Sequence, residues 1–355
     1  MEILSLSVRD FRNYENFSVN FQEGVNLIYG KNGVGKTNLL EAIFLFASGK
    51  SFRGSKEKEM VNFLGENAKI KLVFKDRIGI HTLEAELFKN RKKILYRNGI
   101  EIKKLSEYLG LFRAVIFTPD HLSLIKGSPE FRRKFLDVAM CQSFPRYVAI
   151  LSDYNKILNQ KNALLKNENP NEILLDVYNE RLSVLGASIT KSRGAFLSRL
   201  CESAGKIYFE MTDKKETLSI FYETQTEKNS EDLKKSYFDL FERKKQTEIL
   251  KKMCLYGAQR DDFSIFINGK NARLFASQGQ QRSAVLSLKM SEGELSKSYT
   301  GEECVYLLDD ILSELDAERK NFVLKKLQNR QFIITCCEDV EKFSAVKKIQ
   351  IKRSV

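Results

Sequence analysis

The sequence feature that most constrains the fold is the stretch Gly30 to Thr37, which reads GKNGVGKT. It fits the pattern G-x-x-x-x-G-K-[ST], in which glycines let the backbone turn tightly so that consecutive N–H groups point at an anion. The apolar run 25–29 before it predicts a buried strand, and 38–45 predicts a helix whose N-terminal dipole faces the same anion. A glycine-rich turn without a ligand is the alternative, and the flanking strand and helix argue against it. The stretch therefore predicts a nucleotide-binding loop in an α/β fold.

Each position of this loop has an expected role. The candidate nucleotide-binding residues are Gly30, Lys31, Asn32, Gly33, Val34, Gly35, Lys36 and Thr37. Lys36 can stabilise the charge of the β- and γ-phosphates, and the Thr37 hydroxyl can coordinate Mg²⁺. Asn32 is a candidate contact of the γ-phosphate.

The composition limits the classes of protein to which the chain can belong. The chain has 355 residues, is 43% hydrophobic and contains four prolines, which suggests a soluble protein with two domains or one large domain with an insertion. No stretch reaches the ~18 uncharged apolar residues that a membrane helix needs. The first residues contain neither a basic n-region nor an apolar h-region, so we expect a cytoplasmic protein with no membrane partner.

The net charge and the cysteines indicate which partners and which metal sites to expect. The net charge of +13 fits a polyanionic partner such as nucleic acid, although a Lys-rich proteome is an alternative that charge alone leaves open. The six cysteines show no C-x-x-C spacing and the two histidines lie far from them, so we expect reduced thiols and no zinc site. Because the chain has only two histidines, it cannot use a catalytic mechanism that needs several.

The periodicity of apolar residues divides the chain into three parts. Residues 1–114 alternate as strands do, with the loop helix embedded among them. From 115 the pattern becomes helical and extends to about residue 250, with one run that continues to about 210. Strand patterns return after 256. We therefore predict an α/β head formed by 1–114 and 256–355, with an inserted, mainly helical lid or arm domain at 115–255.

Two tight hairpin turns are predicted inside the strand-like parts. Asn98-Gly99 and Asn268-Gly269 each separate two short strand patterns, and Asn-Gly is typical of a type I′ turn. Basic residues surround the first turn: Lys89, Arg91, Lys92, Lys93, Arg97, Lys103 and Lys104. A solvated strand edge is the favoured interpretation of this run, and a surface that contacts phosphates is the alternative.

Two further motifs follow in the last third of the chain. The apolar run 304–308 ends in Asp309-Asp310, the Walker B pattern, in which the first carboxylate holds Mg²⁺ through water and the second orients or activates the attacking water. The stretch Ser277 to Gln281 leads into a helix, where a hydroxyl, backbone N–H groups and the helix dipole can face an anion.

These motifs complete the list of candidate site residues. The candidate catalytic residues are Lys36, Asp310 and Ser277, and the candidate metal ligands are Thr37 and Asp309. Ser277, Gly279 and Gln280 join the candidate nucleotide-binding residues.

In the order of these motifs the chain resembles the ABC-type ATPases of the SMC and RecF group, and within it the RecF family of bacterial recombinational repair proteins. The matching features are Phe11-Arg12-Asn13-Tyr14, Gly30 to Thr37, Ser51-Phe52-Arg53, Ser128-Pro129, Arg132 to Asp137, Ser277 to Arg282 and Leu307 to Asp316, which includes Ser313 and Glu314. Lys36 and Ser277 are only 241 residues apart, too close for the long coiled coil of SMC proteins.

The resemblance implies a P-loop ABC-type ATPase head with mixed β-sheets, and ATP with Mg²⁺ as cofactors. It implies that Ser277 contacts the γ-phosphate of ATP bound to a second copy, so that ATP drives head-to-head dimerisation on DNA, double-stranded or at gaps and single-/double-strand junctions. A weak, DNA-stimulated ATPase would reset this state, and RecO and RecR would be partners in loading recombinase. The basic candidates for DNA contact are Lys89, Arg91, Lys92, Lys93, Arg132 and Arg133.

The chain departs from the family pattern at three places. Gly257 to Asp262 reads GAQRDD where the family usually has G-P-H-R-D-D. Thr335-Cys336-Cys337 ends a strand without the switch histidine of many ABC ATPases, and Asp310 stands where transporters place Glu. A shorter acid without that histidine predicts slow turnover.

Two other classes remain as alternatives. A transporter ATPase subunit would explain the loop but not the Phe11–Tyr14 start or the basic charge. A motor helicase or a small-molecule kinase would lack the helix that follows Ser277.

Overall fold

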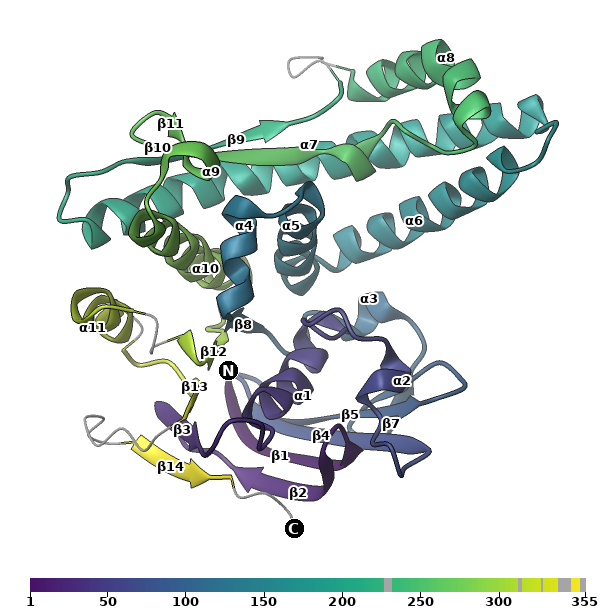
Figure 1. Cartoon of the computed structure of the whole chain (residues 1–355). Helices are drawn as coiled ribbons and strands as arrows, with labels where there is room; N and C mark the ends of the chain where they lie inside the picture. Colours follow the sequence, from purple (N-terminus) through teal and green to yellow (C-terminus); the bar gives the residue numbers. More distant parts are fainter. Residues whose placement is uncertain (227–231, 312–314, 327, 338–345, 352–355) are drawn as a thin grey trace.

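Figure 1 shows the computed structural model of the chain, which describes residues 1–226, 232–311, 315–326, 328–337 and 346–351. An α/β part lies at the bottom of the view, and a mainly helical part built on one long helix lies above it. In the part of the chain that the structure describes, no helix is long and apolar enough to cross a bilayer.

A five-stranded parallel sheet forms the centre of the α/β part. Its order is β14 (Val346–Gln350), β3 (Val25–Tyr29), β13 (Phe332–Cys336), β12 (Val305–Asp309) and β8 (Ala114–Phe117). The strands β8, β12 and β13 are almost entirely apolar because both faces of the sheet are covered, whereas the edge strand β14 contains Lys347 and Lys348. The carboxyl ends of β3, β12 and β13 share one edge, the place where open α/β sheets bind ligands.

An antiparallel sheet and a helix cover one face of the parallel sheet. The sheet has the order β2 (Tyr14–Asn20), β1 (Glu2–Phe11), β4 (Asn67–Lys75), β5 (Ile80–Phe88), β6 (Ile94–Arg97) and β7 (Ile100–Ile102). Helix α1 (Lys36–Ser48) packs in the same core as both sheets, which explains its apolar sequence between 39 and 47. The short helices α2 (Glu57–Met60) and α3 (Leu105–Tyr108) complete this part.

The two predicted hairpin turns are confirmed. Asn98 and Gly99 join β6 to β7 with φ of 48° and 80°, and Asn268 and Gly269 join β10 (Asp262–Ile267) to β11 (Lys270–Asn271) with φ of 49° and 73°. Positive φ at both central residues is the type I′ geometry, which Asn and Gly adopt at low cost.

The helical part is organised around α7 (Glu172–Met211), which contacts α6 (Pro145–Leu165), α8 (Leu233–Lys251) and α10 (Gln278–Thr300). Asn171 caps α7 by accepting a hydrogen bond from the backbone N–H of Leu174 at 3.1 Å. The remaining elements are η1 (Pro119–Leu122), α4 (Ser123–Lys126), α5 (Pro129–Ser143), β9 (Leu218–Glu223), η2 (Ala258–Arg260) and α9 (Ala272–Phe275).

Two elements from the last third of the chain, β10 and α10, pack against the helical part, which the sequence did not indicate. Strand β10 pairs with β9, and its residues Phe263 and Ile265 belong to the core of the helical part. Helix α10 packs on both sides: Leu288 lies in the helical core, while Leu286 contacts the second face of the parallel sheet, which α11 (Ala317–Lys326) also covers through Val323. The division of the chain at residues 114 and 256 stays a prediction.

Candidate nucleotide-binding site

The glycine-rich loop lies between β3 and α1, as predicted, and holds the Lys36 side chain across it. The Lys36 ammonium donates hydrogen bonds to the carbonyl oxygens of Gly30 at 2.7 Å and Lys31 at 3.1 Å. At Gly35 φ is 111°, and an added Cβ would lie 2.6 Å from the Asn13 side chain. The backbone here therefore requires glycine. A phosphate entering the loop can replace the two carbonyls as partner of the Lys36 ammonium.

A buried ion pair supports the loop from behind. Arg12 donates two hydrogen bonds to the Glu41 carboxylate, at 2.8 and 2.7 Å, and Ser51 donates a third. Glu41 is fully buried in α1, so it needs these partners to compensate the loss of water. The neighbouring Asn13 donates to the carbonyl of Val34 inside the loop at 2.9 Å. The Phe11–Tyr14 motif thus positions the phosphate loop.

Sequence reasoning missed Glu41, although the sequence holds a signal for it. Glu41 is the one acidic residue in the otherwise apolar run 39–47, and a buried carboxylate inside such a run requires a cationic partner elsewhere in the chain. The identity of that partner, Arg12, becomes visible only in the fold.

The ends of β12 and β13 bring the Walker B acid, Asp309, to the start of α1. The Thr37 hydroxyl donates to Asp309 Oδ1 at 2.9 Å, and the Thr335 hydroxyl donates to the same oxygen at 2.8 Å. Burial raises the pKa of Asp309, while the hydrogen bonds from Thr335 and Thr37 lower it. The candidate metal ligands Thr37 and Asp309 are therefore adjacent. Sequence reasoning gave Thr335 no role beyond ending its strand.

This pair of oxygen donors fits Mg²⁺. Mg²⁺ prefers hard oxygen ligands and usually keeps several waters while it takes one or two carboxylates and substrate phosphates. The described residues contain no cluster of three or more His, Cys, Asp or Glu side chains that could bind a metal alone. A hydroxyl and a carboxylate beside a phosphate loop suit a metal that arrives with its nucleotide.

Asp310 and Asn32 lie beside a cysteine. The Cys337 thiol donates to Asn32 Oδ1 at 2.9 Å and lies 3.7 Å from Asp310 Oδ2. The backbone N–H of Asp310 donates to the Thr335 hydroxyl at 3.0 Å, which fixes the turn after β12. A thiol thus stands at the strand end where many ABC ATPases have their switch histidine.

The two histidines are used elsewhere. His121 accepts a hydrogen bond at Nδ1 from the backbone N–H of Thr118 at 2.9 Å, and burial lowers its pKa well below the usual value, so the ring is neutral. His81 pairs with Asp76 at 3.0 Å.

Ser277, the first residue of the Ser277–Gln281 motif, lies at the surface at the start of α10. We call this motif the signature and α10 the signature helix. Its hydroxyl accepts from the backbone N–H of Gln280 at 3.2 Å, and the Gln280 side chain accepts from the Ser277 N–H at 2.9 Å. This capping box satisfies the first turn of the helix. Gly279 leaves room for Arg319, whose guanidinium would lie 3.3 Å from an added Cβ. Among the described residues, Ser277 makes no hydrogen bond to Lys36, Thr37 or Asp309.

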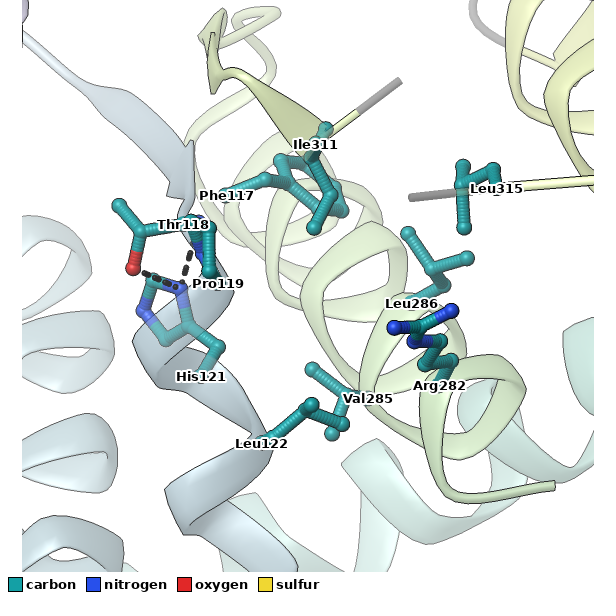
Figure 2. A pocket seen from close by; sticks show the side chains of 10 residues that line it. All are labelled: Phe117, Thr118, Pro119, His121, Leu122, Arg282, Val285, Leu286, Ile311 and Leu315. Carbon is teal, nitrogen blue, oxygen red and sulfur yellow. Dashed lines mark hydrogen bonds between the residues drawn. The ribbon is translucent and has the colours of Figure 1, made fainter. Parts of the chain in front are cut away.

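The next turn of α10 packs on the strand end before η1. Figure 2 shows that Arg282, Val285 and Leu286 line a small cavity together with residues from the β8–η1 connection and from after β12. These residues are Phe117, Thr118, Pro119, His121, Leu122, Ile311 and Leu315. The apolar cavity left between them measures about 20 Å³, close to the ~10–15 Å³ that one water needs. The signature helix is thereby packed against Ile311, the second residue after Asp309. Ser313 and Glu314 of the resembling motif lie outside the described residues.

The basic candidates for DNA contact separate into two groups. Lys89, Arg91 and Lys92 are exposed around the β5–β6 connection. Lys93, in contrast, is bound internally, to the carbonyl of Gly49 at 2.8 Å and to Glu57.

Arg132, another candidate for DNA contact, is a buried residue and not a surface cation. Its guanidinium donates to both oxygens of Asp262, at 2.6 and 2.8 Å, and only 6% of the residue is exposed. Arg133 is half-buried and donates to the carbonyl of Asp261 at 2.9 Å. Because two N–H groups of the Arg132 guanidinium are already bonded to the Asp262 carboxylate, few of its donors remain for a phosphate of DNA.

Comparisons with known proteins agree with this geometry. The sequence family described as RecF/RecN/SMC N terminal domain matches residues 2–354. The DNA replication and repair protein RecF of Clostridium acetobutylicum is 40% identical over 346 residues, which are 97% of this chain and 95% of that protein.

Two solved structures extend the comparison. The recombination mediator protein RecF bound to ATP, of the RecFOR pathway, is 37% identical with a TM-score of 0.92, covering 98% of this chain and 95% of that chain. An Smc head domain with an extended coiled coil, derived from Pyrococcus furiosus, is 15% identical with a TM-score of 0.57, covering 100% of this chain and 94% of that one. This second likeness concerns the fold alone.

Proposed function

Because the chain belongs to the RecF family of DNA replication and repair proteins, we propose that it is an ATP-gated, DNA-binding protein of recombinational repair. The observation that carries the proposal is the hydrogen bond between Thr37 and Asp309, which joins the phosphate loop to the Walker B strand across the whole sequence. Lys36 lies beside this pair with its ammonium directed at the loop. One chain thus supplies phosphate and metal contacts.

In the proposed site ATP binds with Mg²⁺. The loop N–H groups and Lys36 hold the phosphates, and Thr37 and Asp309 serve the metal directly or through water. When bound, Mg²⁺ neutralises phosphate charge. Asp310 orients or activates the attacking water, and Asn32 contacts the γ-phosphate.

The site is completed by a second copy of the chain. Ser277 is exposed, and the start of its helix presents the positive end of the helix dipole at the surface. In a symmetric dimer this helix start from one subunit reaches the γ-phosphate bound to the other, through Ser277, Gly279 and Gln280. ATP then acts as the ligand that joins two heads.

Hydrolysis resets this state slowly. Asp310 is a short acid, and it has a thiol neighbour where many ABC ATPases use histidine. We expect steady-state turnover well below about 10 s⁻¹, the median for enzymes. DNA would raise this rate by favouring the dimer.

DNA is the proposed polyanionic partner, in the duplex form and at gaps or junctions between single and double strands. The net charge of +13 supports it, and Lys89, Arg91 and Lys92 are the exposed candidates for phosphate contacts. The affinity for duplex DNA should fall steeply with salt, and a salt-insensitive interaction would contradict the proposal.

RecO and RecR are the proposed protein partners, because a similar solved structure belongs to the RecFOR pathway. We also propose that the protein works in the cytoplasm.

Sedimentation velocity with and without ATP and Mg²⁺ tests the proposal. The wild type should shift from monomer to dimer with ATP, while Lys36→Ala and Ser277→Ala should stay monomeric. Lys206→Ala, which removes an exposed partner of Glu202, is the matched control and should dimerise as the wild type does. Failure of ATP to promote dimers in the wild type, or normal dimers of Ser277→Ala, would contradict the proposal.

A further inference from the structure

A polar cavity lies in the helical part, between α5, α6, α7 and the turn η2. Its volume is about 130 Å³, and its polar lining comes from Arg133, Asp137, Tyr154, Asn155, Arg193 and Gln259. One wall is the stretch 257–262 that departs from the family pattern. A cavity of ~150 Å³ holds benzene, with about six heavy atoms, so this one has room for a molecule of about five. A polar cavity of this size calls for a polar occupant.

Two of the nearby arginines already have carboxylate partners. Arg193 is 3% exposed and donates to both Asp137 oxygens, at 2.9 and 3.0 Å, and to the carbonyl of Ala258 at 2.7 Å. Arg132 is bound to Asp262 in the same way. The charge of Asp137, the one carboxylate that lines the cavity, is therefore already matched.

Arg133 differs from both. Within the described ranges no carboxylate oxygen lies within 4 Å of its guanidinium, and its hydrogen bond is to the backbone carbonyl of Asp261 at 2.9 Å. Burial lowers the pKa of Arg133, as do the positive charges of Arg193 and Arg260, while the carboxylates of Asp262 and Asp137 raise it. A half-buried cation without a carboxylate in direct contact is stabilised by an anion.

The neutral groups of the lining favour the same kind of ligand. Tyr154 donates its hydroxyl hydrogen to Gln259, and the Gln259 amide donates to the carbonyl of Tyr256 at 2.6 Å, so both are used inside the protein. Asn155 is exposed at the cavity, and its side-chain amide has no hydrogen bond to any other described residue. The donors left for an occupant are the Arg133 fork and the Asn155 amide.

We propose that this cavity is a binding site for a tetrahedral oxyanion, of the phosphate type, held by the Arg133 guanidinium and the Asn155 amide. Arginine binds such oxygens in a bidentate manner, and an oxyanion of five heavy atoms fits the volume. The anion would come from free phosphate or from the backbone of DNA. The site is separate from the phosphate loop and does not rest on the proposed function.

The test uses inorganic phosphate and a protein whose phosphate loop is disabled. In a Lys36→Ala background, thermal unfolding is followed with phosphate and with sodium chloride at equal ionic strength. Phosphate at tenfold excess over its dissociation constant should raise Tm by about 2–4 °C relative to chloride. Adding Arg133→Gln should abolish this rise, and Asn155→Ala should reduce it.

Two further variants keep the test decisive. Arg133→Lys retains the charge without the fork, so it should weaken phosphate binding by about tenfold and still unfold cooperatively. Arg146→Gln removes an exposed arginine on α6 and should leave the phosphate response intact. An equal Tm in phosphate and chloride, or an undiminished phosphate response in Arg133→Gln, would overturn the proposal.

A DNA-binding arm identifies the source of the anion. If the site accepts a backbone phosphate, Arg133→Gln should lower duplex affinity several-fold and inorganic phosphate should compete with DNA. If it accepts free phosphate, duplex affinity should be the same in Arg133→Gln and Arg146→Gln while the thermal response still differs.

Discussion

The phosphate loop and the signature helix are the two halves of one predicted site, and they differ in how their residues are hydrogen-bonded within the chain. Around the loop, Lys36, Thr37 and Asp309 are linked to each other or to nearby backbone by hydrogen bonds of 2.7–3.1 Å. At the start of α10, Ser277 is exposed and bonds only within its own helical turn, among the described residues. The first region is assembled by folding, whereas the second is prepared for something outside the chain.

This difference predicts how substitutions should behave. Changes that break the contacts supporting the loop, such as those at Arg12 and Gly35, should damage both the free energy of unfolding and nucleotide binding, because the same contacts serve both. Asp309 is the exception, because burial disfavours its charge. Changes at Ser277 should leave the isolated chain nearly unaltered and act only on assembly. The following predictions test this contrast.

The largest effect is expected at the buried pair behind the loop. Arg12→Ala leaves the fully buried Glu41 without its cationic partner, and breaking such a pair costs about 3–5 kcal/mol. Denaturant unfolding should show this loss together with weaker ATP binding. Arg12→Leu with Glu41→Leu removes both charges and should recover much of the stability but not the ATP affinity. If the double variant also binds ATP normally, the pair does not position the loop.

Asp309→Asn should separate chemistry from stability. The amide keeps the shape but lacks the charge that serves Mg²⁺, so hydrolysis should fall by about 10²–10³-fold. Because burial disfavours the Asp309 carboxylate, the variant should unfold at the same or a higher denaturant concentration. Asp239→Asn, an exposed change on α8, is the control. A stability loss without a rate loss would show that Asp309 is only structural.

The glycines of the loop offer a matched pair. An alanine Cβ at Gly35 would meet Asn13 at 2.6 Å, whereas one at Gly33 would meet nothing within 4 Å, although both have positive φ. Gly35→Ala should therefore cost about 2–4 kcal/mol and Gly33→Ala about 1 kcal/mol. Equal losses in denaturant unfolding would mean that the contact with the Phe11–Tyr14 motif is unimportant.

The smallest effect on the isolated chain is expected at Ser277. Replacing a serine N-cap by Ala costs about 1 kcal/mol, but by Gly only a few tenths. Ser277→Gly thus removes the hydroxyl while the helix start is preserved. Its unfolding curve and its affinity for ATP as a monomer should match those of the wild type, while ATP-dependent dimers should be lost. A monomer that binds ATP several-fold more weakly would place Ser277 in the site of its own chain.

The sequence predicts the local parts of this account well and the long-range parts poorly. The loop with its strand and helix, and both Asn-Gly turns, follow from short patterns because their geometry depends on neighbouring residues. Burial of Arg132 against Asp262, 130 positions away, depends on how β10 packs on the helical part, and no local pattern reports that. The same holds for Thr335 beside Asp309. The hydrogen bond from the Thr335 hydroxyl to Asp309 depends on β13 lying beside β12, and this strand order is not visible in the sequence.

The claim that one chain supplies half of an ATP site is tested most directly by mixing two inactive variants. Lys36→Ala lacks the phosphate contact and Ser277→Gly lacks the trans contact, so each alone should show neither ATP-dependent dimers nor hydrolysis. In a mixed dimer one of the two sites combines the intact loop of one chain with the intact Ser277 of the other. Equimolar mixing should therefore restore up to about half of wild-type ATPase, because only mixed dimers form and each has one good site of two. No recovery on mixing, with both variants folded, would contradict the account.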